Sequence, residues 1–138
     1  MMDDTERAMV EEFDRRYRLG EASARRRVEQ AVLGVDYGAT SYTTLGQAAQ
    51  LAERLQLGPD VSLLDLGAGS GWPGLHLASV TGCRVVLADR PKEGLRVAQQ
   101  RALADGLADQ CSVVASSGDL LPFRSQIFDA ITHTDVFC

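Results

Sequence analysis

The sequence predicts an α/β fold built on a mostly parallel sheet that is covered on both faces. Three observations carry this prediction. From residue 61 onward, short apolar runs of strand length alternate with stretches of helical periodicity. The runs are largely continuous in apolar character, as expected for strands buried on both faces. A loop of alternating glycines joins the first run to the following helix, as at the ligand-binding end of such sheets.

Two amphipathic helices are expected before the sheet. The first carries Met9, Phe13 and Tyr17 at four-residue steps, so that all three lie on one face. The apolar stripe of the second consists of Ala24, Val28, Ala31 and Val32. Each stripe needs a surface to cover. Residues 34–44, which contain glycine, serine and two tyrosines, are expected to form a loop.

The remaining elements follow from the apolar pattern. A third helix is predicted over residues 45–55, and Gly58-Pro59 closes it. The other predicted helices cover residues 72–80 and 91–107, and the predicted strands cover residues 62–66, 84–88, 111–115 and 128–132.

Length and composition are those of a single globular domain. The 138 residues, 45% apolar and 24% charged, are enough for one domain with a real core. No apolar run approaches the roughly 20 residues that span a bilayer, and the acidic start of the chain is unlike a signal peptide. We therefore expect a cytoplasmic protein. The net charge of −5 gives no general attraction to nucleic acid.

Neither the basic residues nor the cysteines indicate a specific site. Acidic residues are interspersed with the N-terminal arginines, which indicates a solvated, ion-paired helix face, with a partner surface as the alternative. The arginines are Arg15, Arg16, Arg18, Arg25, Arg26 and Arg27. Cys83, Cys111 and Cys138 lack metal-type or redox-type spacing, so we expect reduced thiols and no metal site.

The most informative stretch covers residues 63–71. Its sequence is LLDLGAGSG, a buried strand that leads into alternating glycines and then into a helix. Glycines let the backbone come close to a ligand at the carboxyl end of the sheet, beside a helix N-terminus. The stretch therefore predicts a nucleotide-type site. Dinucleotide enzymes and methyltransferases both have such a loop here, so the loop alone does not distinguish them.

Three details separate these two classes. Counted from Gly67, the third glycine of the dinucleotide fingerprint would stand at position 72, but this chain has Trp72 there. An indole argues against the close helix packing that the glycine permits. Asp65 places a carboxylate at the end of the strand, where it suits a ligand's cationic amino group better than a pyrophosphate. A further acidic landmark, Gly118-Asp119, follows the third strand.

With these details the chain resembles the class I S-adenosylmethionine-dependent methyltransferases, in particular their small-molecule, type 11-like group. The first landmark is DLGAGSG at residues 65–71, which has the family pattern D-x-G-x-G-x-G. The others are VVLAD at 85–89, SSGDLLPF at 116–123 and FDAI at 128–131. All four stand in the family's order. The chain departs from the pattern at the WPG start of the next helix and at Arg90-Pro91.

The resemblance implies a Rossmann-like three-layer sandwich with the strand order 3-2-1-4-5-7-6, of which this chain supplies strands 1 to 4. The fourth strand, residues 128–132, would then be a bare apolar edge, through which the chain could associate with itself. Residues 1–44 would form N-terminal helices and a loop that covers the cofactor, and residues 45–138 a cofactor-binding core that is incomplete at its C-terminus. S-adenosylmethionine is the implied cofactor, S-adenosylhomocysteine the product, and a small molecule the methyl acceptor. Neither nucleic acid nor a membrane is an expected partner.

The same resemblance implies the residues of the site. Asp89 would bind both ribose hydroxyls, since a carboxylate accepts two hydroxyl protons, and Asp119 would contact the adenine amino group. The implied cofactor-binding residues are Asp65, Gly67, Ala68, Gly69, Ser70, Trp72, Asp89, Arg90, Gly118, Asp119 and Leu120. His133 follows the fourth strand, where this family presents the methyl group, and it is the candidate general base.

Several of these residues also have a structural interpretation. Asp65 would then cap the helix or order the loop through backbone N–H groups, and the two other aspartates would be ordinary loop residues. Trp72 is either a packing residue or a wall of the methionine pocket, and Arg90 lies along the adenine or in solvent. Tyr37 and Tyr42 either anchor their loop to the core or fold over the cofactor.

The predicted activity is methyl transfer from S-adenosylmethionine to a small-molecule acceptor. A nucleophilic atom of the acceptor displaces the sulfonium methyl group, and the protein contributes orientation and exclusion of water. Two alternatives stay open: a non-catalytic nucleotide-binding module that interacts through its N-terminal helices, and a dinucleotide-dependent oxidoreductase. We expect the chain to be a piece of a longer protein that is inactive alone or needs a partner strand.

Overall fold

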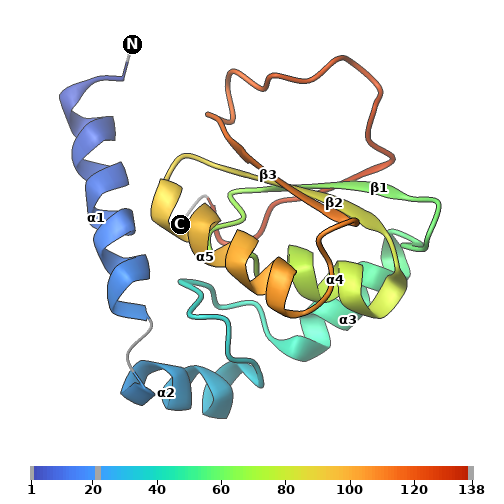
Figure 1. The fold of residues 1–138 in the computed structure, drawn as a ribbon, viewed down its shortest axis with the longest axis horizontal. Coiled ribbons are helices and arrows are strands. Elements are labelled where there is room, and N and C mark those ends of the chain that lie inside the picture. The colour runs from blue at the N-terminus through green and yellow to red at the C-terminus, as the bar shows by residue number, and fades with distance from the viewer. Residues whose placement is uncertain (1, 21–22, 137–138) are drawn as a thin grey trace.

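A computed structural model describes residues 2–20 and 23–136 of the chain. Within them, five helices and four strands follow one another in the order α1 (Asp4–Gly20), α2 (Ser23–Leu33), α3 (Leu45–Arg54), β1 (Ser62–Leu66), α4 (Gly74–Thr81), β2 (Arg84–Asp89), α5 (Lys92–Ala104), β3 (Cys111–Ala115) and β4 (Ala130–Thr132) (Figure 1). The predicted alternation of strands and helices from residue 61 onward is confirmed.

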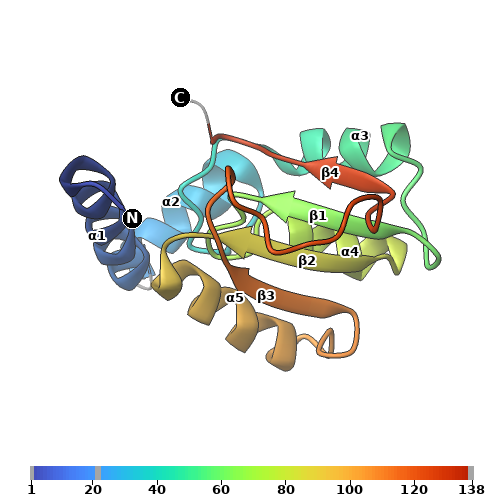
Figure 2. The ribbon, with the colours of Figure 1, turned by 90° about the horizontal axis from the view of Figure 1, so that it is seen from above.

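The four strands form one parallel sheet in the order β3-β2-β1-β4. β1 lies inside the sheet, with its Leu64 opposite Val86 of β2 and Ile131 of β4. The carboxyl ends of the strands point toward α1 (Figure 2). This order confirms the part of the expected topology that strands 1 to 4 make up.

The helices are distributed unevenly over the two faces of the sheet. α3, α4 and α5 cover one face, whereas the connection from β3 to β4, residues 116–129, crosses the other (Figures 1 and 2). The core lies between the sheet and these helices, where Leu63, Leu75 and Leu87 are fully buried. On the second face the described residues contribute a connection and not a helix, because residues 116–129 lack an apolar period of helical spacing.

Side-chain hydrogen bonds stabilise the N-termini of α3 and α5. The Thr44 hydroxyl accepts a hydrogen bond from the Gln47 N–H, and the Gln47 side chain accepts one from the Thr44 N–H, so α3 begins with a capping box. α5 follows Pro91, which has no side-chain acceptor. Asp14 of α1 replaces it by accepting a 2.8 Å hydrogen bond from the Glu93 N–H, so α1 docks where α5 starts.

α2 buries a different face from the one that its apolar pattern predicts. Val28 and Val32 are 63% and 68% exposed, so the prediction that this stripe covers the protein is wrong. Glu29 and Leu33 are buried in its place. The Glu29 carboxylate accepts hydrogen bonds from the N–H groups of residues 37–39, at 2.9, 2.7 and 3.2 Å. Three donors compensate the burial of the charge and fix the orientation of the helix.

Predicted element boundaries agree with the structure at β1 and β3 and differ by a few residues elsewhere. α4 begins at Gly74, two residues after the predicted start. β4 has three residues, because Phe128 packs edge-on against Phe123, with ring centroids 5.0 Å apart, and does not extend the strand. α3 starts at Leu45, the first residue of the predicted core, and the division of the chain at this point stays a prediction.

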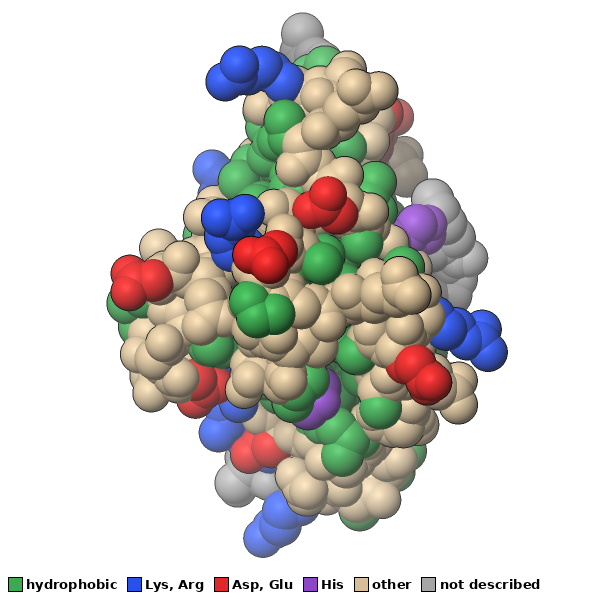
Figure 3. Space-filling model, turned by 90° about the vertical axis from the view of Figure 1, so that its right-hand side faces the viewer, with side chains coloured by type: hydrophobic (Ala, Val, Ile, Leu, Met, Phe, Trp, Pro, Cys, Tyr) green, Lys and Arg blue, Asp and Glu red, His purple; other side chains and the backbone are tan. Residues whose placement is uncertain are grey.

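Charged side chains are mixed on the face of the molecule that lies away from α1. Acidic and basic groups are scattered there among hydrophobic ones, and the described residues on this face form no cluster of one sign (Figure 3). None of the described helices is both long and apolar enough to cross a membrane. Cys83 and Cys111 are free thiols, as predicted, and Cys138 lies outside the described residues.

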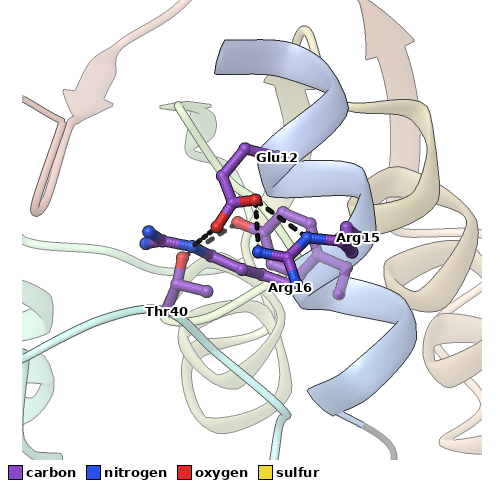
Figure 4. Close-up of polar contacts among 5 residues, drawn as sticks. Glu12, Arg15, Arg16 and Thr40 are labelled. Atoms are coloured by element: carbon purple, nitrogen blue, oxygen red, sulfur yellow. Dashed lines mark hydrogen bonds and ion pairs between the residues drawn. The ribbon is translucent and has the colours of Figure 1, made fainter. Parts of the chain in front are cut away.

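Arg15, Arg16 and Arg26 of the arginine-rich surface of α1 and α2 are ion-paired, in agreement with the predicted helix face. The Glu12 carboxylate lies between Arg15 and Arg16, at 2.5 and 2.9 Å from their guanidinium nitrogens (Figure 4). Arg26 pairs with Asp36 at 3.3 Å. The two pairs of Glu12 are exposed, so each contributes little to stability.

Candidate functional site

A pocket of about 580 Å³ lies at the carboxyl ends of the strands, between the loop after β1 and α1. Ligands bind at this edge in open parallel sheets, and the volume is typical of sites for small molecules and cofactors. Its walls come from α1, from a segment between α2 and α3, from the loops after β1, β2 and β3, and from the chain after β4. We refer to residues 39–43, between α2 and α3, as the strap.

The loop after β1 reaches the pocket with its backbone. Gly67 and Ala68 donate their N–H groups to the Ala88 carbonyl of β2, at 2.8 and 3.2 Å, which ties the loop to the neighbouring strand. Gly69 has a φ of 53°, and a Cβ atom there would collide with the Tyr17 hydroxyl of α1. Glycine at position 69 therefore allows α1 to close over the loop.

Asp89 ends β2 at the wall of the pocket. Its two carboxylate oxygens accept 2.7 Å hydrogen bonds from the N–H groups of Gly69 and Arg90. Burial raises the pKa of Asp89 above its ordinary value, although these two N–H groups act in the opposite direction. Each oxygen has a further lone pair, so the carboxylate can also accept two hydroxyl protons from a ligand.

Arg90 connects two sides of the pocket. Its guanidinium lies 3.2 Å from the carboxylate of Glu6 in α1 and 3.6 Å from that of Asp119 after β3. It also donates a 2.6 Å hydrogen bond to the Ser117 hydroxyl. All four residues line the pocket. Arg90 does not simply extend into solvent, because these contacts hold α1 against the core.

Two hydroxyl groups in the pocket wall are buried and lack a hydrogen-bond partner among the described residues. They belong to Ser70 in the glycine-rich loop and to Ser116 after β3. Buried polar groups are normally paired, so these two indicate a polar ligand. The carboxylates in the same wall are those of Glu6, Asp89, Asp119 and Asp135. With the Arg90 guanidinium as their counterpart, they favour a ligand that carries positive charge.

Trp72 belongs to the core and to the pocket wall at once. It is 3% exposed, and its indole N–H donates a 2.9 Å hydrogen bond to the Thr43 carbonyl of the strap. Its ring packs against Tyr37, with centroids 5.2 Å apart. Tyr37 therefore anchors its loop to the core, which was one of its two predicted roles. Tyr42 does not, since it is 79% exposed and lies outside the pocket wall.

Comparison with known proteins gives the family. Residues 63–138 match the model of a family described as a methyltransferase domain. This chain belongs to that methyltransferase family.

Named relatives of the methyltransferase domain agree with this assignment. The methyltransferase GfsG of Streptomyces halstedii is 37% identical over 82 residues, which cover 59% of this chain and 30% of GfsG. A sarcosine/dimethylglycine N-methyltransferase of Halorhodospira halochloris is 34% identical over 85 residues, covering 59% of this chain and 29% of that protein. The chain thus spans less than a third of the length of these curated relatives.

A solved structure shares the fold of the methyltransferase domain. It is a methyltransferase dependent on S-adenosylmethionine, from Thiobacillus denitrificans, in complex with S-adenosylhomocysteine. The two chains are 26% identical with a TM-score of 0.53, and the match covers 65% of this chain and 36% of that one. The parallel sheet with its helices is therefore the fold of known methyltransferases.

The structure of the methyltransferase domain brings most of the predicted site residues together. Those that line the pocket are Gly67, Ala68, Gly69, Ser70, Trp72, Asp89, Arg90, Gly118 and Asp119. They come from the loops after β1, β2 and β3, which meet because the carboxyl ends of parallel strands lie at one edge of a sheet. Their contact with a cofactor stays a prediction.

Asp65 is not part of the pocket wall. Its side chain is buried, and its two oxygens accept 3.0 Å hydrogen bonds from the Gly74 N–H at the start of α4 and from the Thr132 hydroxyl of β4. This is the helix-capping contact of its structural interpretation. Burial raises the pKa of Asp65 to about 7, against the effect of both hydrogen bonds.

Leu120 and His133 also lie outside the pocket wall of the domain. Leu120 is 79% exposed. His133 is exposed because side chains alternate along β4 and its extension: Thr132 is buried, whereas His133 points to the other side. The two residues that follow it, Thr134 and Asp135, do line the pocket. A role for His133 as a base stays a prediction.

α1 forms a pocket wall that the motifs of the domain do not predict. Met9, Val10, Phe13 and Tyr17 line the pocket from this helix. The four-residue spacing of three of them identifies the apolar face, on which Met9 is still 52% exposed, but it does not identify what that face covers. The strap and the chain after β4 complete the wall and likewise carry no motif.

Proposed function

We propose that the chain is the S-adenosylmethionine-binding part of a methyltransferase that acts on a small-molecule acceptor. The observation that carries this proposal is the shared pocket: the glycine-rich loop, Asp89 and Asp119 meet at the carboxyl ends of the parallel strands. Membership of a methyltransferase family supports it.

The residues of the pocket fit this cofactor chemically. S-adenosylmethionine carries a cationic sulfonium and an ammonium group, which suit a wall with more carboxylates than guanidinium groups. Each carboxylate oxygen of Asp89 has a lone pair that is not used by its backbone N–H donor, and we assign these lone pairs to the ribose hydroxyls. Asp119 would take the adenine amino group. The unpartnered hydroxyls of Ser70 and Ser116 would bind further polar atoms of the cofactor.

The chain's own residues would orient the cofactor and keep water out. When bound, the cofactor supplies a methyl group that is already activated on sulfur. Met9 and Phe13 of α1 contribute an apolar wall, and the strap closes the pocket beside them. Burial raises the pKa of Tyr17 to about 12. Its hydroxyl therefore keeps its proton near neutral pH and acts as a hydrogen-bond donor or acceptor, not as a base.

Two observations support a small-molecule acceptor. Curated relatives include proteins named as glycine/sarcosine/dimethylglycine and sarcosine/dimethylglycine N-methyltransferases, which are named for small amines with a carboxylate. The net charge of −5 would repel a polyanionic acceptor such as a nucleic acid.

Asp89→Ala is expected to weaken the binding of S-adenosylhomocysteine by about 1–3 kcal/mol, because the ribose hydroxyls lose their acceptor. This corresponds to roughly 5- to 150-fold in the dissociation constant. Calorimetric titration of the 138-residue chain measures it. Asp109→Ala replaces an exposed aspartate beyond α5 and is the matched control, for which we expect wild-type affinity.

The same titration, repeated with NADH, separates a methyltransferase from a dinucleotide-dependent oxidoreductase. Binding of S-adenosylhomocysteine without NADH binding supports the proposal. Failure of the wild type to bind S-adenosylhomocysteine would overturn it, and tight binding of NADH would indicate a dinucleotide enzyme. Unchanged affinity in Asp89→Ala would remove Asp89 from the site.

A further inference from the structure

Asp135 lies three residues beyond the end of β4 and contacts the strap. Its Oδ2 atom accepts hydrogen bonds from the N–H groups of Tyr42 and Thr43, at 3.0 and 3.3 Å, and from the Thr43 hydroxyl at 2.9 Å. The Ser41 hydroxyl donates a fourth hydrogen bond to the same oxygen. Four donors from three consecutive residues thus meet at one atom.

Asp135 is the charged anchor of the strap. The other anchors described above are neutral: the Tyr17 hydroxyl shares a 3.2 Å hydrogen bond with the Thr40 hydroxyl, and Trp72 donates to the Thr43 carbonyl. Burial acts to raise the pKa of Asp135, but the Ser41, Tyr42 and Thr43 donors together hold it below its ordinary value. The carboxylate is therefore ionised near neutral pH, and hydrogen bonds to an ionised acceptor are the stronger kind.

The strap and Asp135 separate two hollows. Thr40 and Ser41 line the pocket described above, whereas Tyr42 and Thr43 line a second hollow of about 340 Å³ beside α3. Asp135 lines both. A displaced strap would therefore change the shape of both hollows at once.

Val136, the residue after Asp135, holds the chain after β4 against the glycine-rich loop. A Cβ atom at Gly67 would collide with the Val136 side chain, so Val136 packs directly on the glycine-rich loop. The chain after β4 is thus enclosed between the glycine-rich loop and the strap. Its position fixes the distance between these two walls of the pocket.

We propose that Asp135 is a positioning residue, which holds the strap as the wall between the two hollows and so determines how tightly the cofactor is enclosed. This role is carried by its contacts with residues 41–43, in addition to the charge that it contributes to the pocket wall. The inference rests on the proposed function for the identity of the ligand, whereas the contacts of the strap are independent of it.

The side-chain charge of Asp135 can be removed without straining its backbone. Asp135 has a φ of 58°, in the left-handed region that Asp and Asn adopt more readily than other side chains. Asp135→Asn therefore keeps the backbone conformation and weakens the four hydrogen bonds to the strap. On the strap, Ser41→Ala together with Thr43→Val removes the two hydroxyl donors and keeps the backbone donors.

Titration with S-adenosylhomocysteine tests the coupling between these sites. Asp135→Asn and the Ser41→Ala/Thr43→Val pair are each expected to weaken binding by about 5- to 20-fold, because each weakens the same charge-assisted contact. The variant that combines all three substitutions is expected to bind no more weakly than the weaker binder of these two variants, because the effects of substitutions at interacting residues are not additive. Asp109→Asn is the control, with wild-type affinity expected.

Fluorescence gives a second measurement that a general loss of stability would not reproduce. Trp72 is the single tryptophan of the chain, and its indole donates to the strap at Thr43. We expect the emission of ligand-free, folded Asp135→Asn to shift to longer wavelength, and that of Asp109→Asn to stay at the wild-type position.

The outcomes separate this inference from the proposed function. Wild-type affinity with unshifted emission in Asp135→Asn would overturn the inference, and so would fully additive losses in the combined variant. If the wild type does not bind S-adenosylhomocysteine, the proposed function fails, but the emission of Asp135→Asn still tests whether Asp135 positions the strap.

Discussion

Replacing Asp65 by alanine is expected to lower the free energy of unfolding by about 3–5 kcal/mol. The side chain is 1% exposed and connects three elements: it belongs to β1, accepts from the Gly74 N–H of α4 and accepts from the Thr132 hydroxyl of β4. Alanine leaves both donors buried without a partner and leaves a cavity between the elements. The loss should therefore exceed that for any exposed aspartate.

Asp65→Asn isolates the contribution of the charge. Asparagine retains both contacts if its carbonyl faces Gly74 and its amide faces the Thr132 oxygen. Burial raises the pKa of Asp65 to about 7 in the folded state. Its protonation thus stabilises the fold: this contribution is complete below about pH 4, the ordinary value for Asp, and is lost as the pH rises to 7. The wild type should lose stability relative to Asp65→Asn over this interval.

Urea unfolding of the wild type, Asp65→Asn and Asp65→Ala, at about pH 5 and about pH 8, measures both effects. The alanine variant should be the least stable at either pH. The wild type should fall relative to the asparagine variant by roughly 2–4 kcal/mol across the whole interval. Wild-type stability in Asp65→Ala would contradict the first expectation, and parallel pH curves for the wild type and Asp65→Asn the second.

Gly69→Ala is expected to weaken the binding of S-adenosylhomocysteine by about tenfold or more and to lower stability by about 2–3 kcal/mol. The backbone at Gly69 has a φ of 53°, and the new Cβ atom would overlap the Tyr17 hydroxyl. The Tyr17 ring also packs over Gly94 of α5, where an added Cβ atom would lie 2.9 Å from it, so the ring is held between the loop and α5. α1 would then have to lift from the loop and open the pocket.

Calorimetry and thermal unfolding check this expectation against two further variants. A Cβ atom at Gly58 would have no atom within 4 Å, so Gly58→Ala is the matched control and should change stability by less than about 0.5 kcal/mol. Adding Tyr17→Phe to Gly69→Ala removes the atom that is struck first and should restore part of the affinity. If Gly69→Ala binds like the wild type, α1 does not close on this glycine as described.

The fold was predictable where its signal is local. An apolar run of strand length bounded by polar or loop residues marks a strand, so the bounds of β1 and β3 follow from the sequence to the residue, although β3 is a partly exposed edge strand. The pocket was predictable for a related reason. Parallel strands end at a common edge, so a glycine-rich loop, Asp89 and Asp119 that follow three different strands must meet there.

The parts that could not be predicted depend on contacts between distant or polar groups. Glu29 orients α2 by accepting N–H groups eight to ten residues further along the chain, and a buried carboxylate leaves no periodic pattern. The partners of Tyr17 are a strap hydroxyl and two glycines of other elements. Asp65 was selected by its place in a motif and His133 by its place after the fourth strand. Neither signal gives the direction of the side chain, which is set by the alternation of side chains along β1 and β4.

The way in which α1 is fastened has a consequence for the order of folding. Two of its anchors join residues far apart in the sequence: Asp14 binds the Glu93 N–H, which lies 79 residues further on, and Glu6 binds Arg90. Contacts of such sequence separation form only after the intervening chain is ordered. We therefore expect α1 to dock on the core late in folding, so that its amide hydrogens become protected from exchange only after the sheet has formed.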